Sequence, residues 1–159
     1  MQATDPTDHS VPSGAAFLLT QVGAHAARRF AERVADLGVA PSDVGILRMI
    51  LMSPGRSQQS LAEELGVVPS RVVTLLDGLQ DKGLVERRRN PADRRNYALY
   101  LTEEGTRMMS AVRDLGATHE DDLLAALDPS ERARLATMLQ AVAAQQGLTP
   151  GVHPGYRRP

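Results

Sequence analysis

The sequence predicts a mainly α-helical protein with one small β-hairpin, and two observations on periodicity predict this fold class. Apolar residues recur at steps of three and four, the period of an amphipathic helix, along most of the 159 residues. The period changes to two only around residues 84–101, where Asn90-Pro91-Ala92-Asp93 offers turn residues between two alternating runs. The composition fits a globular chain, because 42% of the residues are hydrophobic and 23% are charged.

Capping residues and Gly or Pro breaks divide this pattern into elements. The predicted elements are, in order, helices over 15–37, 41–52, 58–65 and 69–81, strands over 84–87 and 96–101, and helices over 102–127 and 129–146. Gly116 is a candidate bend in the first helix after the hairpin. The polar residues 1–13 predict a disordered lead-in, and residues 148–159, with several Gly and Pro, predict a flexible tail.

The helix over 58–65, a tight link containing Gly66 and the helix over 69–81 form the arrangement of a helix-turn-helix. The second helix of this motif can lie in the major groove of DNA, with its N-terminal residues toward the base edges. The candidate contacts are Pro69, Ser70, Arg71, Val73 and Thr74. The spacing alone also fits two packed helices without a ligand, so the interpretation depends on the hairpin.

Five arginines gather on the hairpin within nine positions: Arg87, Arg88, Arg89, Arg94 and Arg95. Guanidinium groups gain little from burial, whereas beside DNA they gain Coulomb attraction and the release of counterions. Residues 69–101 include seven basic and four acidic side chains, a net charge of +3, although the whole chain has −1. A solvated charged turn, with Asp93 paired to a neighbouring arginine, is the alternative for the hairpin alone. A helix-turn-helix followed by a basic hairpin favours a winged helix-turn-helix that binds double-stranded DNA.

Residues 57–105 resemble the winged-helix core of the MarR (multiple antibiotic resistance regulator) family. The matching segments are residues 61–67 (LAEELGV), 70–74 (SRVVT), 79–87 (LQDKGLVER), 93–95 (DRR) and 101–105 (LTEEG). The last two are the most specific, and the flanking helices extend the resemblance to about residues 15–147. Many members carry a basic residue after the Thr that matches Thr74, where this chain has Leu75. This departure leaves one phosphate or base contact without its usual residue.

The resemblance implies a homodimer on DNA. The helices over 15–37 and 106–147 would form the dimerisation part, and residues 41–105 would form the winged helix-turn-helix DNA-binding domain. Two-fold symmetry then predicts a palindromic operator with half-sites about one DNA turn apart, roughly 34–36 Å. Repression, by occlusion of a promoter, is the commoner outcome in the family.

The resemblance also divides the roles of the wing residues. Arg95 matches the arginine that enters the minor groove, where a narrow A·T-rich groove attracts a guanidinium group. Asp93 matches the acid that braces the wing. Arg87, Arg88, Arg89 and Arg94 are then expected to contact phosphates, which position a protein on DNA without specifying the sequence.

Many members of the family bind a small anionic aromatic molecule between the dimerisation and DNA-binding parts. His25, Arg29 and Arg48 could offer polar groups to such a ligand in this chain. The alternatives are structural, namely a partly buried histidine or a dimer contact at His25, and a solvated or salt-bridged arginine face beside it.

The sequence does not predict an enzyme, a metal site or a cofactor. It has no Gly-x-Ser-x-Gly, His-x-x-x-His or glycine-rich phosphate loop, and its four histidines are scattered. The absence of Cys excludes disulfides and thiolate metal ligands. No apolar run approaches the ~20 residues that a membrane span requires, and the polar N-terminus lacks the order of a signal peptide. We therefore expect a cytoplasmic protein without a membrane partner.

The predicted function is that of a sequence-specific transcription regulator of double-stranded DNA, in this family most often a repressor. Release by a small aromatic or phenolic effector is a further expectation. The alternative is a winged-helix module that binds another protein instead of DNA. A net-neutral recognition surface would favour that alternative, whereas the net charge of +3 favours DNA.

Overall fold

The structure, a computed structural model, describes residues 14–153 and Tyr156, without the side chains of Arg94 and Arg95. The lead-in expected over residues 1–13 lies outside this part of the chain. The described elements are, in order, α1 (Ala15–Ala35), α2 (Pro41–Met52), α3 (Gln58–Leu65), α4 (Pro69–Asp81), β1 (Val85–Asn90), β2 (Asp93–Leu101), α5 (Glu103–Leu123) and α6 (Pro129–Gln145). The predicted fold class, mainly α with one hairpin, is confirmed. Among the described helices, none has the length and apolar character to cross a membrane.

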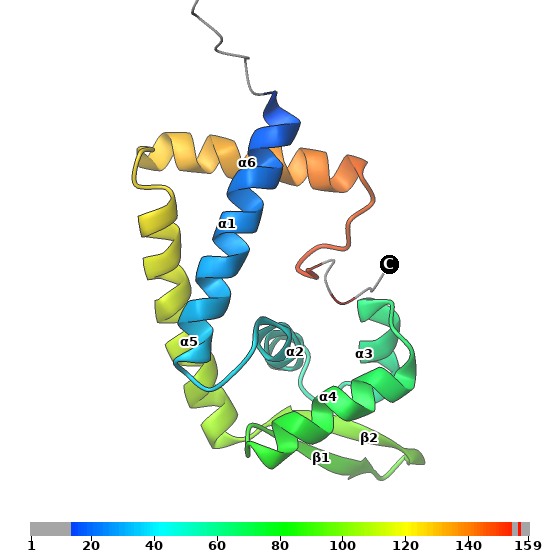
Figure 1. Cartoon of the computed structure of the whole chain (residues 1–159). Coiled ribbons are helices and arrows are strands. Elements are labelled where there is room, and N and C mark those ends of the chain that lie inside the picture. Colours follow the sequence, from blue (N-terminus) through cyan, green and yellow to red (C-terminus); the bar gives the residue numbers. More distant parts are fainter. Residues whose placement is uncertain (1–13, 154–155, 157–159) are drawn as a thin grey trace, which may run out of the picture.

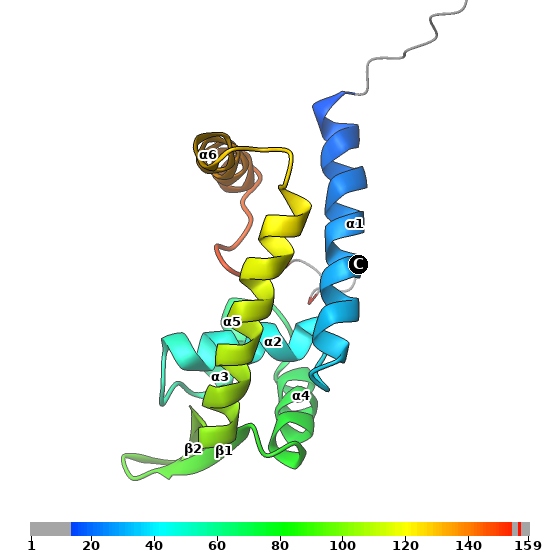
Figure 2. The ribbon, with the colours of Figure 1, turned by 90° about the vertical axis from the view of Figure 1, so that its left-hand side faces the viewer.

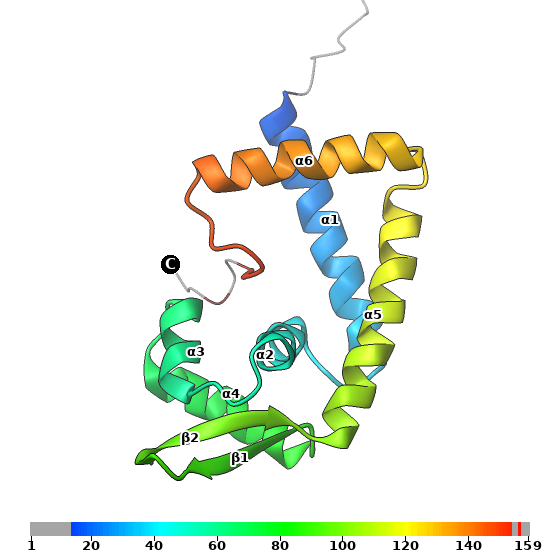
Figure 3. The same ribbon diagram turned by 180° about the vertical axis from the view of Figure 1, so that it is seen from behind.

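Helices α1 and α5 connect two parts of the molecule (Figure 1). At one end lie α2, α3, α4 and the antiparallel hairpin, and at the other end α6 begins next to the end of α5 and runs across the direction of α1 (Figure 3). Figure 2 shows α5 leaving the base of the hairpin and running beside α1 toward α6. The first part has the order and arrangement of a winged helix-turn-helix.

Helix α2 lies at the centre of the winged-helix part. Its Ile46, Leu47 and Ile50 side chains are fully buried. They belong to one core with fully buried leucines of α3, α4 and β2, which are Leu61, Leu65, Leu76, Leu79 and Leu99. Each such side chain contributes about 1.5–3 kcal/mol by leaving water. The helix-turn-helix and the hairpin are therefore held by the same core.

The hairpin is longer than the sequence predicts. Strand β1 continues to Asn90 and β2 begins at Asp93, so only Pro91 and Ala92 form the turn. The Asn90 Oδ1 atom accepts a hydrogen bond from the Ala92 N–H at 3.0 Å, which stabilises a tight turn. Leu84 was expected in the first strand but precedes it, because its N–H donates to the Leu79 carbonyl and its own carbonyl accepts from Thr102 N–H.

Helices α1 and α5 end two and four residues earlier than predicted. Helix α1 ends at Ala35 rather than at residue 37, and the chain turns through Gly38, whose φ is 78°. Helix α5 ends at Leu123 rather than at residue 127, and it passes the candidate bend at Gly116 without interruption. Arg132 of α6 donates to the carbonyls of residues 124 and 127, and these bonds stabilise the turn between the last two helices.

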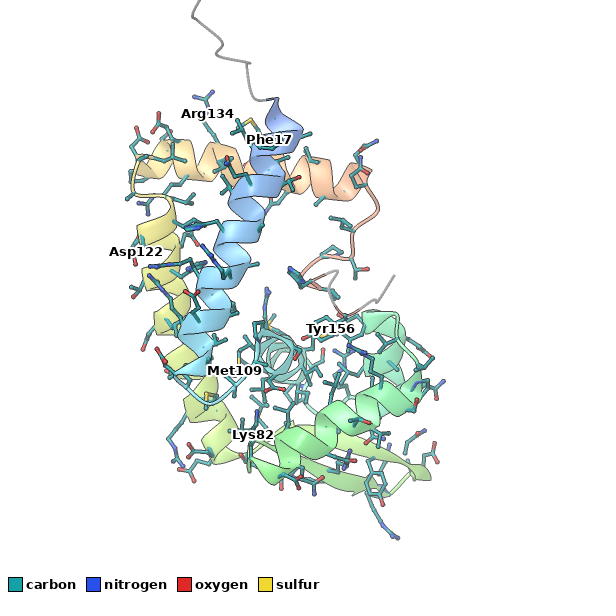
Figure 4. The ribbon with its side chains drawn as sticks, in the orientation of Figure 1. Phe17, Lys82, Met109, Asp122, Arg134 and Tyr156 are labelled. Carbon is teal, nitrogen blue, oxygen red and sulfur yellow. The ribbon has the colours of Figure 1, made fainter. Side chains whose placement is uncertain are left out.

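The described part of the C-terminal segment differs from the flexible tail that the sequence predicts. After α6 the chain returns to the winged-helix part, where Val152 packs against the core and the Tyr156 side chain is buried (Figure 4). The Tyr156 hydroxyl donates to the Ser42 carbonyl of α2. A pattern rich in Gly and Pro disfavours regular structure, but it does not exclude contacts with the core such as those of Val152 and Tyr156.

The junction between β2 and α5 explains why Leu, Thr and Gly stand at positions 101, 102 and 105. The Thr102 hydroxyl caps α5 by accepting from the Gly105 N–H at 2.9 Å, and it donates to the Gly83 carbonyl at 2.6 Å. Gly105 is buried against the backbone before β1, where an added Cβ would lie 2.0 Å from the Leu84 carbonyl oxygen. The pattern therefore fixes the start of α5 against the base of the wing.

Gly105→Ala is expected to lower the stability of the protein, because the new methyl group must displace backbone. Overpacking of this kind costs about 1–3 kcal/mol, and thermal unfolding followed by circular dichroism measures it. Gly78→Ala is the matched control, since a Cβ there meets no atom within 4 Å and α4 gains helix propensity. If both variants melt at or above the wild-type temperature, the proposed role of Gly105 is wrong.

Candidate nucleic-acid interface

Caps at both ends of α3 and a buried face of α4 fix the helix-turn-helix. The Ser57 hydroxyl caps α3 by accepting from Ser60 N–H at 3.0 Å, and Gly66 closes the helix in the left-handed conformation at φ 65°. Helix α4 buries Val72, Leu76 and Leu79 against the core. The opposite face of α4 is therefore free for a ligand.

Four of the five residues predicted for the recognition helix lie exposed on α4. They are Pro69, Ser70, Val73 and Thr74. The Thr74 hydroxyl donates to the Ser70 carbonyl at 3.2 Å, so its oxygen stays on this surface as an acceptor. Their contacts with DNA remain predictions.

Arg71 differs from the other four. It is half-buried on a flank of α4 and lines a cavity of about 170 Å³ with Pro41, Ser42, His153 and Tyr156. Arg71 was predicted to contact base edges. Successive residues of a helix are rotated by about 100°, so Arg71, one position after Ser70, lies toward the C-terminal segment instead. Sequence periodicity could have indicated this flank, but not the segment that covers it.

Arg87 was expected to contact phosphate, and the structure gives it an internal role. Its guanidinium group and Nε donate to Gln58 of α3 at 2.7 Å, to Gln80 of α4 at 2.8 Å and to the Val73 carbonyl at 3.3 Å. It also forms an ion pair with Asp77 at 2.7 Å. Only 17% of its side chain is exposed. Arg87 therefore fixes the wing relative to both helices of the helix-turn-helix.

The next two arginines lie on opposite faces of β1, because side chains alternate along a strand. The Arg88 guanidinium carbon lies 4.3 Å from the centre of the Tyr100 ring, and the group also pairs with Glu86. Arg89 is exposed and its backbone is opposite Tyr97. Arg88 and Arg89 thus offer positive charge to the two sides of the wing.

The tip of the wing places the remaining predicted residues on β2. Asp93 accepts a hydrogen bond from Asn96 at 2.7 Å, and its backbone is opposite Asn90. Arg94 and Arg95 follow it in the same strand. The strand positions agree with a wing tip, and the minor-groove role of Arg95 stays a prediction.

A groove of about 390 Å³ separates the recognition helix from the wing. Gln58, Val73, Gln80, Arg87 and Tyr97 line it. Sequence reasoning missed the two glutamines and Tyr97. Gln80 follows Val73 by seven positions, two helical turns, so the α4 pattern did contain a signal for one of them.

The structure separates the three residues predicted for an effector. His25 and Arg29 of α1 line a cavity of about 140 Å³ together with Arg33, His119, Asp122 and Leu123. Arg48 does not line it, because it is exposed on α2 and lies beside Gly151 of the C-terminal segment. Arg48 therefore stands apart from the cavity of His25 and Arg29, and a role of these residues toward an effector stays a prediction. Sequence reasoning missed His119 and Asp122, since nothing in the spacing shows that α5 lies against α1.

Charges within this cavity are partly compensated. Arg33 pairs with Asp122, and this hydrogen bond holds the pKa of the Asp122 carboxyl below its usual value. Burial, followed by the nearby charges of Arg33 and Arg29, lowers the pKa of His119. Near pH 7 the histidine is then neutral, and Arg29 and Arg33 supply the positive charge. In Figure 4, Asp122 lies on the stretch of α5 that faces α1.

No group of three or more potential metal ligands occurs in the described part of the chain.

The fold and this surface define a winged helix-turn-helix transcription regulator that binds DNA. A family model described as the MarR family matches residues 37–96. The chain is 33% identical over 124 residues to a putative transcriptional regulatory protein for the hcr operon of Thauera aromatica, covering 77% of this chain and 75% of that one. The chain belongs to the MarR family.

Solved structures agree with this assignment. The transcriptional repressor CouR bound to a 23-mer DNA duplex is 30% identical, with a TM-score of 0.74 over 88% of this chain and 99% of that one. The MarR family protein Rv2887 of Mycobacterium tuberculosis, in complex with salicylic acid, is 26% identical, with a TM-score of 0.65 over 81% and 96% of the two chains. The chain therefore belongs to a family of transcription regulators. This membership argues against an enzyme and against a module that binds only protein.

Arg87→Lys tests whether Arg87 braces the wing or contacts phosphate. Lysine keeps the charge but cannot donate to several elements at once, because it lacks the planar fork. We expect a loss of about 1–3 kcal/mol in stability and weaker binding to a duplex from the gene's own upstream region. Arg89→Lys is the matched control, since Arg89 is exposed and lysine can replace it at a phosphate. Wild-type stability in Arg87→Lys would contradict the bracing role.

Proposed function

We propose that this regulator is a homodimeric repressor that binds a palindromic operator and is released by a small aromatic anion. It would work in the cytoplasm, beside the DNA. The observation that carries the proposal is the shared surface of α4 and the wing, which Arg87 holds in one geometry. The exposed first turns of α4 suit the major groove, and the basic tip suits the adjacent backbone and minor groove.

The unpartnered apolar surface of α1 and α6 supports a dimer. No residue of α6 is buried, and its Met138 and Val142 side chains are 58% and 49% exposed. Phe17 and Val22 of α1 are 59% and 47% exposed. Between α1, α5 and α6 runs an apolar groove of about 520 Å³. Contiguous apolar surface of this kind marks an interface, and the same helices of a second copy are its natural occupant.

Two-fold symmetry carries a consequence for the operator. Each protomer presents one α4 and one wing, so a dimer recognises two inverted half-sites about one DNA turn apart, roughly 34–36 Å. The repressor role rests on the CouR relative, which is itself a transcriptional repressor.

The cavity of His25 and Arg29 supports an effector that is an aromatic anion. Arg29 and Arg33 provide positive charge to this cavity. The centre of the His119 ring, which lines the cavity, lies 5.6 Å from the centre of the Phe30 ring, which lines the larger apolar groove. His119 and Leu123 line both this cavity and the larger apolar groove. An aromatic acid could place its carboxylate beside the arginines of the cavity and its ring in the apolar groove. The salicylic acid complex of Rv2887 favours this class of ligand.

Arg95→Ala is expected to weaken binding to the gene's own upstream duplex by about tenfold or more, since one wing contact per half-site is worth about 1–3 kcal/mol. Fluorescence anisotropy measures the affinity. Light scattering checks that wild type and variant are both dimers. Equal affinity in the variant would contradict the wing assignment, and a monomeric wild type would contradict the dimer.

Salicylate is the probe for the effector. We expect millimolar salicylate to raise the melting temperature of the wild type and to weaken its binding to DNA, because the anion binds one conformation preferentially. Arg29→Gln should abolish both effects while leaving DNA binding without salicylate unchanged. Arg48→Gln is the matched control, since Arg48 lies outside the cavity. A salicylate response that persists in Arg29→Gln would exclude this cavity as the site.

A further inference from the structure

The groove between α4 and the wing has two different ends. Val73 lies in the exposed first turns of α4, and Tyr97 lies two residues nearer the hairpin tip than Leu99, the partner of Arg87 in the strand register. The N-terminal residues of a recognition helix approach the bases, and the first helix of the motif crosses the DNA backbone. Val73 and Tyr97, with Gln58 at the start of α3, therefore mark the end of the groove toward DNA. Gln80, two helical turns after Val73, marks the other end.

Arg87 fixes which way the two glutamine amides point. A guanidinium group can only donate hydrogen bonds, so the Oε1 atoms of Gln58 and Gln80 face Arg87 at 2.7 and 2.8 Å. The NH2 group of each amide is then directed away from the guanidinium. Neither NH2 group donates to any residue that the structure describes. Gln58 therefore presents two N–H donors in a fixed orientation at the groove that it lines.

Tyr97 adds a second donor at the same end of the groove. Its side chain is 39% exposed, and within the described part of the chain its hydroxyl has no hydrogen-bond partner. The backbone of Arg89 is opposite Tyr97, and strand alternation puts the Arg89 side chain on the same face of the hairpin as Arg87. The Asp77 carboxylate already pairs with Arg87 at 2.7 Å. Uncharged donors beside positive charge suit a phosphodiester, which is anionic and can only accept hydrogen bonds.

We propose that Gln58 and Tyr97 form a phosphate clamp, in which the Gln58 NH2 group and the Tyr97 hydroxyl donate to the DNA backbone where it passes between α4 and the wing. Arg87 is a positioning residue of this clamp, because its bond turns the Gln58 amide. The clamp deepens the proposed function and rests on it, since it acts only on bound DNA. Phosphate contacts carry no sequence information, so the clamp adds affinity and orientation but leaves base preference unchanged.

Gln58→Glu tests the clamp without removing the bond to Arg87. A carboxylate still accepts from the guanidinium and suits the first turn of a helix, so the melting temperature should not fall. It cannot donate to phosphate and repels it. By fluorescence anisotropy we expect affinity to fall about tenfold or more, by the same factor on a duplex from the gene's own upstream region and on a scrambled duplex of the same length.

Gln80→Glu is the matched control, because it makes the same charge change at the other glutamine bonded to Arg87. We expect a clearly smaller loss of affinity, since salt screens a charge at the far end of the groove. Unchanged affinity in Gln58→Glu would overturn the clamp. Equal losses in both variants would also overturn it, because they would show an effect of charge alone. A loss confined to the upstream duplex would show a contact with bases instead of phosphate.

Tyr97→Phe removes only the hydroxyl, so we expect wild-type stability and affinity lower by about threefold or more on both duplexes. Tyr100→Phe is its control, since Tyr100 lies on the other face of the same strand, where its ring stacks on Arg88. Wild-type affinity in Tyr97→Phe, or an equal loss in Tyr100→Phe, would exclude Tyr97 from the clamp. Arg95→Ala, measured in parallel, separates the proposals. If it weakens binding while Gln58→Glu and Tyr97→Phe do not, only the clamp is wrong, whereas a wild type that binds neither duplex contradicts the proposed function itself.

Discussion

The Arg87 guanidinium group joins three elements, because it is attached to β1 and bonds Gln58 of α3 and both Asp77 and Gln80 of α4. A protein that reads DNA with a helix and a wing must hold the two at a fixed distance and angle, since a duplex offers its grooves at fixed spacing. The buried face of α4 fixes its position on the core but leaves the long hairpin free to swing. A planar group with several donors removes this freedom at one point. Arg88 and Arg89 can then remain exposed on the two sides of β1, because Arg87 already joins the wing to both helices.

The other end of the molecule, formed by α6 and the first half of α1, lacks a buried core of this kind. The winged-helix part has a full core, whereas α6 buries none of its residues and α1 exposes the large side chains of its first half. Apolar side chains that are exposed together in this way favour burial against a partner. The DNA-binding part is therefore complete within one copy, and the proposed dimer is needed to complete the other part. The proposed palindromic operator would follow from this division, because the two-fold symmetry of the proposed dimer would arise from the helices that expose apolar surface in the single chain.

Local patterns in the sequence predicted the fold closely. The site was predicted less completely, because it depends on contacts between segments that are far apart in the sequence. Capping residues and glycines gave the bounds of α2, α3 and α4, because helix ends depend on neighbouring residues. The role of Arg87 could not be predicted, since its partners are 7 to 29 positions away. Arg48 was grouped with His25 and Arg29 as a source of polar groups for an effector, but it lies on α2 and does not line the cavity between α1 and α5. Tyr156 follows a stretch with several Gly and Pro residues, and only the three-dimensional structure shows that its ring lies over Gly45 of α2.

Helix α5 connects the proposed effector cavity to the wing. Its first turn is fixed at the base of the hairpin, where Thr102 bonds the Gly83 carbonyl and Gly105 touches the backbone of Leu84. The helix has 21 residues and is about 30 Å long. Near its C-terminal end, His119 and Asp122 line the cavity together with the arginines of α1. Because α5 passes Gly116 without a break, a shift of its far end would also move the base of the wing if the helix moves as one rigid body. An anion that replaces Asp122 as the partner of Arg33 would change the contact between α1 and α5, and this helix would transmit the change. The effect on DNA binding can be no larger than the difference in affinity of the anion for the two conformations. A weakly bound aromatic acid can therefore shift the protein away from DNA only by a modest factor, unless its concentration far exceeds its dissociation constant from the released form.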